Sequence, residues 1–288
     1  MEKQFSTRHA FLIIAHEKPM VLKRLVEALD HPLNDIFIHI DKKCDIEKFH
    51  VATQDSKVIY LDNRIDGRWG DYSLVEIEIQ LIEKALDHRT YDYLHLISGV
   101  DYPIKSMQEI HTFCAEHKGK EFIGLGKNET DEETKWRSQH YFLFSKDFKS
   151  TNLFKRITRK LFVWIQTMIG YSRYKGKVIK GSQWWSITSN FAEYILQHKS
   201  EIQKYFHNTY CPDELFAQTL CWNSQFRSNV YNIDNEFESC KRYIPWRNGA
   251  LLPLSHEDFL EMKKSEKWFG RKFSEKDIDK WIEISKYQ

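Results

Sequence analysis

The sequence has no excess of one charge, no long apolar run and no recognisable leader. Its 288 residues carry 43 Lys and Arg against 41 Asp and Glu, a formal net charge of +2. Overall charge therefore does not favour nucleic acid as a partner. No stretch approaches the roughly 18 apolar residues of a membrane span, and no small-residue cleavage site follows the apolar run at residues 9–15. We expect a protein of the cytoplasm, most simply a bacterial one.

Cysteine is scarce and scattered. The five cysteines form no C-x-x-C pair, which argues against a zinc site or a dithiol redox site. Their odd number and wide spacing suit a reducing compartment. We predict that all five are buried thiols: Cys44, Cys114, Cys211, Cys221 and Cys240.

Several common catalytic and nucleotide motifs are also missing. No G-x-G-x-x-G follows the first strand-like run, and there is no G-x-x-x-x-G-K-[ST], so neither a dinucleotide site nor a P-loop has support. The patterns H-x-E-x-x-H and G-x-S-x-G do not occur, and the 13 histidines show no metal-ligand spacing. Zinc hydrolases and serine hydrolases of the common types are therefore excluded.

What the chain does contain is an alternation of strands and helices. Short runs rich in Ile, Val and Tyr lie at 9–15, 35–40, 57–61 and 91–97, with helical patterns at 19–28, 72–87 and 106–117. This order predicts an α/β fold with a mostly parallel central sheet and helices on both faces. Ligands of such sheets bind beyond the carboxyl ends of the strands, which here are followed by His16, Asp41, Asn63 and Ser98.

The second half continues without a linker or a repeat. A strand-like segment at 181–188 is followed by helical patterns at 189–206 and 212–223, an extended segment at 241–246, and helices at 256–265 and 274–286. At 41% hydrophobic and 29% charged residues, the composition is that of a folded protein. We expect one domain over residues 1–288.

One block of the chain is strongly basic. Residues 146–180 contain ten Lys or Arg and a single acid, Asp147, and residues 154–169 carry apolar side chains at helical spacing. Two interpretations remain open. Either the apolar face packs on the protein with the cations in water, which we favour, or the helix lies on an anionic membrane surface.

A pair of acids stands in the segment C-P-D-E-L. Asp213 and Glu214 follow Pro212 in what the pattern predicts to be the first turn of a helix. Acids at this position commonly cap a helix because they interact well with its dipole. The other interpretation makes one of them a general base, and spacing alone favours capping.

Five segments taken together resemble a known family. GRWGDYSLVEIEIQLIEKAL, YDYLHLISGVDYPIKSMQEI, KGSQWWSIT, CPDELFAQTL and WFGRKFSEKDID occur in this order. They are similar to the core-2/I-branching β-1,6-N-acetylglucosaminyltransferases and peptide O-xylosyltransferases, glycosyltransferase family 14. The similarity runs from about residue 9 to 280.

The resemblance implies an inverting transferase with the GT-A nucleotide-sugar fold that uses no metal and lacks the usual Asp-x-Asp pair. The only D-x-D here is Asp277-Ile278-Asp279, in a C-terminal helical pattern. By analogy Glu214 is the base that deprotonates the acceptor hydroxyl, and Asp213 keeps the capping role. The nucleotide-binding half would span about 1–125 and the acceptor half about 126–288.

The resemblance also implies a Lys and an Arg that stabilise the departing diphosphate. The Lys corresponds to Lys272. The Arg has no ungapped match, so we place Arg247 first and Arg242 second. No cofactor is expected, because the UDP-sugar is a substrate. The resemblance implies that no metal is used either.

Further site residues follow from the same comparison and from strand ends. The expected donor site is formed by Ala15, His16, Asp41, Arg64, Trp69 and Asp101. His16 is equally well read as a structural hydrogen-bond partner, and Asp101 as a residue that shapes the turn at Pro103. The resemblance also implies acceptor contacts from Trp136, Arg137 and Tyr141. Trp184 and Trp185 are further candidates, because consecutive strand residues point to opposite faces and one of the two should face the cleft if the other faces the core.

The function implied is transfer of N-acetylglucosamine from UDP-N-acetylglucosamine to a hydroxyl of a glycan or lipid-linked oligosaccharide, with a β linkage. The alternatives are UDP-xylose or another UDP-sugar as donor, or a glycan-binding module without catalysis. The presence of both Glu214 and Lys272 argues against a module. Nucleic acid is not an expected partner.

Overall fold

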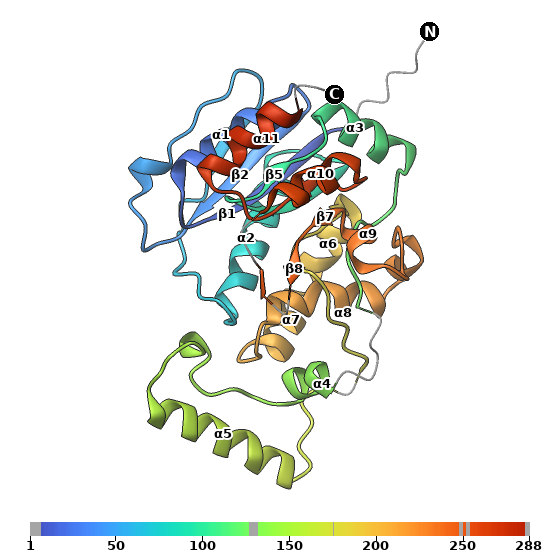
Figure 1. Cartoon of the computed structure of the whole chain (residues 1–288). Helices are drawn as coiled ribbons and strands as arrows, with labels where there is room; N and C mark the ends of the chain where they lie inside the picture. Colours follow the sequence, from blue (N-terminus) through green and yellow to red (C-terminus); the bar gives the residue numbers. More distant parts are fainter. Residues whose placement is uncertain (1–6, 127–131, 175, 248–249, 252–253, 286–288) are drawn as a thin grey trace.

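The computed structural model describes residues 7–126, 132–174, 176–247, 250–251 and 254–285, and a five-stranded sheet forms its centre (Figure 1). Four strands are parallel, and the edge strand β6 runs antiparallel to β4. The predicted α/β class with a mostly parallel sheet is confirmed. In sheet order the strands are β3 (Lys57–Tyr60), β2 (Asn34–Ile40), β1 (His9–Ala15), β4 (Tyr93–Ser98) and β6 (Ser186–Thr188).

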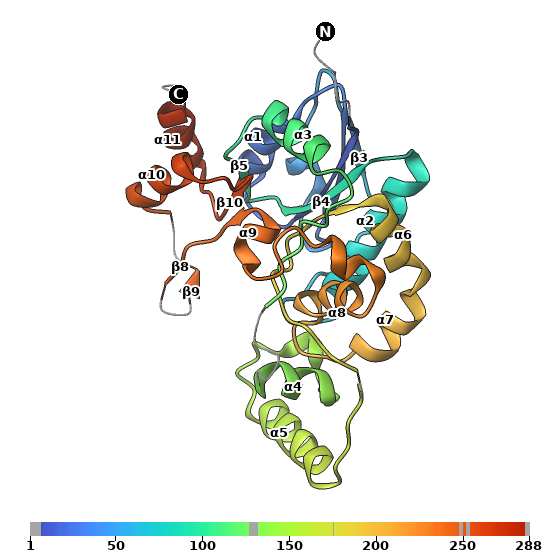
Figure 2. The ribbon, with the colours of Figure 1, turned by 90° about the vertical axis from the view of Figure 1, so that its right-hand side faces the viewer.

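Helices cover both faces of the sheet, as Figure 2 shows. Alternate residues of β1 point to opposite sides: Phe11 and Ile13 belong to one apolar core, and Ala10 and Leu12 to the other. The first core is covered by α1 (Pro19–Leu29), α3 (Met107–Glu116), α10 (His256–Lys264) and α11 (Glu275–Ser285). The second is covered by α2 (Ser73–His88), α6 (Ser189–Gln197), α7 (Lys199–Phe206) and α8 (Phe216–Trp222).

Several elements differ from the sequence prediction. The predicted helix 189–206 breaks at His198 into α6 and α7, and the predicted helix 212–223 starts as the 3-10 turn η3 (Pro212–Glu214) before α8. Residue 286, the predicted end of the last helix, lies outside the described residues. Helical elements that the sequence does not predict are η1 (Ile46–Phe49), α4 (Glu132–Gln139), η2 (Ser145–Asp147), η4 (Gln225–Asn229) and α9 (Glu236–Cys240).

A small second sheet places part of the C-terminal segment near the carboxyl end of β4 in the main sheet. Its strands are β5 (Tyr102–Pro103), β10 (Phe269–Gly270) and β7 (Arg242–Tyr243), with β10 between the other two. β5 follows β4 almost directly, so β10 reaches the carboxyl end of β4 by pairing with β5. The hairpin β8 (Trp246–Arg247) and β9 (Ala250–Leu251) follows β7.

All five cysteines are free, in agreement with the prediction. Four of them are buried. Cys44 is half-buried, and its thiol donates to the His16 carbonyl. The prediction of burial is therefore wrong for Cys44, because this residue lies in the loop after β2 and not in an element that the core covers.

Helices α4 and α5 (Leu153–Met168) lie apart from the central sheet at one end of the molecule, in both views (Figures 1 and 2). The helix that the sequence predicts at 154–169 is confirmed by α5. The favoured interpretation of its apolar face is wrong, because these side chains point to solvent: Phe154 is 71% exposed and Ile157 63%. Among the described residues, no helix is long and apolar enough to cross a bilayer.

Candidate active site

The parallel strands β1 and β4 end close together. A Cβ atom added to Gly99, just after β4, would lie 2.6 Å from the Cβ atom of Ala15 at the end of β1. Only glycine fits at this contact. Ala15 also accepts a hydrogen bond from the Asp41 amide through its carbonyl oxygen, at 2.9 Å. The residues predicted at the first two strand ends therefore lie side by side.

Asp41 and Arg64 organise the loops around the end of β2. The buried Asp41 carboxylate accepts hydrogen bonds from the amides of Lys43 at 2.8 Å and Gly67 at 3.0 Å. Arg64 donates to the carbonyl oxygens of Ile40, Asp41 and Cys44. These bonds use the Nε and Nη2 atoms of Arg64, so its main role is to cap the strand end.

His16 is exposed beyond the end of β1. Its ring nitrogen lies 4.0 Å from the Glu17 carboxylate, and its side chain is 60% exposed. That position does not suit a structural hydrogen-bond partner. Of the two interpretations of His16, only contact with a ligand remains as a proposal.

A buried ion pair stands at the end of β4. Asp101 is fully buried: one carboxylate oxygen accepts from the Ser98 amide at 3.0 Å, and the other lies 3.4 Å from the Arg271 guanidinium. Burial raises the pKa of Asp101, and the nearby Arg271 opposes this increase. Asp101 therefore shapes the turn and holds Arg271, rather than lying open to a donor sugar.

Arg271 and Lys272 are adjacent cations next to this turn. The Arg271 guanidinium lies over the Trp184 ring at 4.2 Å. Lys272 remains exposed to solvent. Its pKa is lowered, first by partial loss of hydration and then by repulsion from Arg271. Because Lys272 keeps a positive charge that forms no ion pair with a described carboxylate, binding of an anion here would be favourable.

The two arginines predicted to pair with Lys272 have other roles. Arg242 is fully enclosed and donates to the carbonyl oxygens of Leu96, Trp185 and Cys240, so it is structural and the prediction for it is wrong. Arg247 binds the buried carboxylate of Asp258 at 2.5 Å, which compensates its charge. Arg271 is the guanidinium next to Lys272 in the chain, and it is itself paired with the buried Asp101 carboxylate.

The turn η3 gives its two acids opposite environments. Glu214 is 32% exposed, and its Oε2 atom accepts a hydrogen bond from Arg137 Nη1 at 2.7 Å. Arg137 is buried, also pairs with Glu133, and lies over the Tyr210 ring at 4.9 Å. Arg137 therefore orients Glu214 from behind, and the prediction that Arg137 contacts the acceptor is wrong.

Asp213 points into the protein. It is 5% exposed and caps no helix, because α8 begins only at Phe216 and no side chain caps its first turn. Burial and the neighbouring Glu214 raise the pKa of Asp213 to about 7. The pKa of Glu78, a fully buried residue of α2, is raised by burial and by Asp213. The predicted capping role of Asp213 is therefore wrong.

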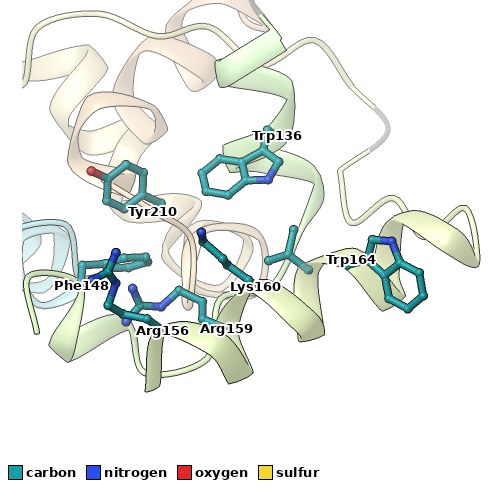
Figure 3. Close-up of a pocket in the computed structure, with 8 residues that line it drawn as sticks. Trp136, Phe148, Arg156, Arg159, Lys160, Trp164 and Tyr210 are labelled. Atoms are coloured by element: carbon teal, nitrogen blue, oxygen red, sulfur yellow. The ribbon is translucent and has the colours of Figure 1, made fainter. Parts of the chain in front are cut away.

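An aromatic cavity of about 480 Å³ lies between α5 and the loop that precedes η3. Figure 3 shows Tyr210 and Trp136 on one side and the basic residues of α5 on the other. Trp69 packs edge-on against Tyr210, with ring centroids 5.7 Å apart. The structure thus brings the predicted donor residue Trp69 and the predicted acceptor residue Trp136 to the same tyrosine. The lining is Trp136, Phe148, Arg156, Arg159, Lys160, Val163, Trp164 and Tyr210.

The remaining predicted acceptor residues lie elsewhere. Trp185 is fully buried, and Trp184 is 9% exposed beneath Arg271, so neither ring offers a face to a sugar and both predictions are wrong. The Tyr141 ring is covered by the Arg173 guanidinium at 3.9 Å. Tyr141 is not among the residues that line the cavity.

Three residues of this region are not predicted from sequence. Arg271 could be found by its position next to Lys272, and Tyr210 by its place before C-P-D-E. Glu78 falls three residues after Val75 and four before Ile82, both buried. A charged residue on the apolar face of a helix signals a special environment.

Comparisons with known proteins give one family over nearly the whole chain. The model of the Core-2/I-Branching enzyme family matches residues 9–281. Xylosyltransferase 2 of Rattus norvegicus is 22% identical over 290 residues, which cover 92% of this chain and 32% of the relative. Xylosyltransferase sqv-6 of Caenorhabditis briggsae is 24% identical over 279 residues, 88% of this chain and 33% of the relative. The chain thus spans about a third of the length of these relatives.

Replacing Asp213 by Asn is expected to change how stability depends on pH. Because the folded pKa of about 7 exceeds the ordinary 3.8, the contribution of Asp213 to stability is fully present below about pH 4 and is lost as pH rises through 7. Between about pH 5 and about pH 8, the wild type should lose about 2–3 kcal/mol more free energy of unfolding than Asp213→Asn. Urea denaturation at both pH values measures this, and equal losses would contradict the raised pKa.

Proposed function

The chain belongs to the Core-2/I-branching enzyme family, and from this premise we propose that it is an inverting glycosyltransferase. It moves a sugar from a UDP-sugar to a hydroxyl of a glycan, free or lipid-linked, with a β linkage. The observation that carries the proposal is the Glu214 carboxylate, which Arg137 holds through Oε2 beside Tyr210. No described residue donates a hydrogen bond to Oε1 of Glu214, so this oxygen is available to accept a proton.

The proposed reaction is a single displacement. The acceptor hydroxyl loses its proton to Glu214 while its oxygen attacks the anomeric carbon on the face opposite UDP. The bond from that carbon to the diphosphate breaks, and UDP leaves with both electrons. The Trp136 side chain, 42% exposed and lining the cavity beside Tyr210, offers an apolar face on which the acceptor sugar can stack.

The departing diphosphate needs positive charge as it leaves. We propose that Arg271 and Lys272 supply it, at the ligand end of β1 and β4. The Asp101 carboxylate fixes Arg271 in place at 3.4 Å, whereas Lys272 is exposed and available to a phosphate. This arrangement supports a reaction that needs no metal and no cofactor.

The donor that we propose first is UDP-N-acetylglucosamine, in line with the resemblance of the sequence motifs. A specific observation favours UDP-xylose as the second candidate, because the relatives described above are named xylosyltransferases. At 22% and 24% identity, the donor has to be found by assay.

Turnover of a panel of UDP-sugars tests the proposed function. UDP release from UDP-N-acetylglucosamine or UDP-xylose, in the presence of oligosaccharide acceptors, is expected to be unchanged by excess EDTA. Loss of activity in EDTA, with recovery on adding Mn²⁺ or Mg²⁺, would contradict the role given to Arg271 and Lys272. Glycan binding without turnover of any donor would instead indicate a module without catalysis.

Glu214→Gln should lower kcat by roughly 10²–10⁴-fold, because the amide cannot accept a proton. The amide oxygen still accepts the bond from Arg137, so UDP affinity should change little. Asp213→Asn is the matched control in the neighbouring position and should affect kcat far less. Steady-state kinetics and calorimetric titration with UDP measure the two effects. Equal losses in both variants, or loss of UDP binding in Glu214→Gln, would rule out the base assignment.

Lys272→Gln should lower kcat by roughly 10²-fold and weaken UDP binding, as expected for loss of a preorganised positive group at a leaving oxyanion. The comparison variant is Arg247→Gln, which removes a cation already paired with Asp258 and should have a much smaller effect. A larger effect from Arg247→Gln would restore Arg247 as the diphosphate ligand.

A further inference from the structure

Helix α5 turns a continuous apolar surface to solvent. Every member of this surface is between 44% and 71% exposed. At 3.6 residues per turn the members fall on one side of the helix, broken only by Thr158. This outer α5 face consists of Leu153, Phe154, Ile157, Leu161, Trp164, Ile165, Met168 and the following Ile169. Such a patch on a protein surface usually marks an interaction site.

Polar contacts on the opposite side hold α5 in this orientation. Arg159 donates to the carbonyl oxygens of Leu143, Phe144 and Asp147, at 3.0–3.1 Å. The Gln166 side chain accepts from the Tyr141 amide at 2.8 Å and donates to the Tyr141 carbonyl at 2.9 Å. Rolling the outer α5 face inward would break these five bonds, so its exposure follows from the way the helix is fixed.

Cations border the outer α5 face. Arg156 and Lys160 are exposed, and at 3.6 residues per turn they lie beside Leu153 and Trp164 at the edge of this face. Helix α5 contains no acid. The one acid of residues 146–180, Asp147, is paired with Lys155 at 2.6 Å and with Arg68 at 3.5 Å. The local charge is therefore positive next to an apolar surface.

We propose that the outer α5 face docks on an anionic lipid surface. Its apolar side chains enter the boundary between headgroups and acyl chains, and Arg156 and Lys160 bind the phosphates. A second copy of the chain fits less well, because pairing two outer α5 faces would bring their cations together with no acid in the helix to pair with them. This inference does not rest on the proposed transfer reaction.

Flotation of the full chain with vesicles tests the proposal. We expect binding to vesicles of phosphatidylcholine mixed with phosphatidylglycerol, much weaker binding to phosphatidylcholine alone, and a decrease as salt increases. Ile157→Gln with Leu161→Gln should weaken binding by at least about tenfold, because two apolar side chains no longer leave water. Arg156→Gln with Lys160→Gln should weaken it by about 30-fold at low salt.

Matched controls use exposed residues on other helices. Met20→Gln with Leu260→Gln removes two side chains that are 48% and 45% exposed, and Lys276→Gln with Lys280→Gln removes two exposed cations of α11. Both pairs should leave vesicle binding within about twofold of wild type, as expected for residues outside the contact. Arg159 is left intact because it anchors α5 through three carbonyl oxygens.

Two results would overturn the proposal. One is absence of vesicle binding, or binding that is insensitive both to lipid charge and to the α5 variants. The other is a dimer in sedimentation analysis that Ile157→Gln with Leu161→Gln dissociates while vesicle binding is absent, which would identify a second copy as the occupant. Circular dichroism melting of each variant, with an unchanged midpoint, shows that a loss of binding does not come from unfolding.

Discussion

The buried guanidinium of Arg242 connects the parts of the chain on which the site depends. It donates to the carbonyl oxygens of Leu96 in β4, Trp185 before β6 and Cys240 before β7, and to the Ser186 hydroxyl. Burial lowers its pKa to about 10, so it stays charged at neutral pH, and these four acceptors offset much of the desolvation cost. Strand β7 then aligns β10, which leads directly into Arg271 and Lys272. Arg242 and the pairing of β10 with β5 together place both cations at the end of β4.

In the turn at Pro212–Glu214, two neighbouring carboxylates, Asp213 and Glu214, lie in different environments. Glu214 meets Arg137 and solvent, whereas Asp213 is buried, and burial together with the neighbouring Glu214 raises its pKa to about 7. A partly exposed, oriented carboxylate suits proton transfer from a substrate. A buried one with a pKa of about 7 contributes instead to the pH dependence of stability.

Helix α5 has two surfaces of different chemistry, one lining the aromatic cavity and one apolar and exposed. Its inner side contributes Arg159 and Val163 to the aromatic cavity beside Tyr210, and Arg156, Lys160 and Trp164 lie at the edge that the cavity shares with the outer face. The outer side is apolar and exposed. Docking of the outer side on a lipid surface would keep the cavity and the docking face on one element. A glycan carried by a lipid would then reach Tyr210 without leaving the surface that binds α5.

The sequence by itself determined the elements of the sheet and the chemistry of single positions. Apolar runs predict β1 to β4 within a few residues, because strands buried on both faces show continuous apolar sequence. The amphipathic pattern also predicts α5, and ordered motifs point to Glu214 and Lys272. These properties depend on residues close together in the chain, so local sequence is sufficient for them.

Only the tertiary structure decided which residues meet and which side of each one is covered. Arg247 and Arg242 are the first and second candidates in sequence, but Arg242 bonds to carbonyl oxygens in the interior and Arg247 pairs with Asp258. Likewise, apolar periodicity shows that α5 has two sides without showing which one faces the protein. That choice comes from Arg159 and Gln166, whose partners lie on another segment of the chain. Contacts between distant segments decide burial and ion pairing, and a pattern within one segment carries no information about them.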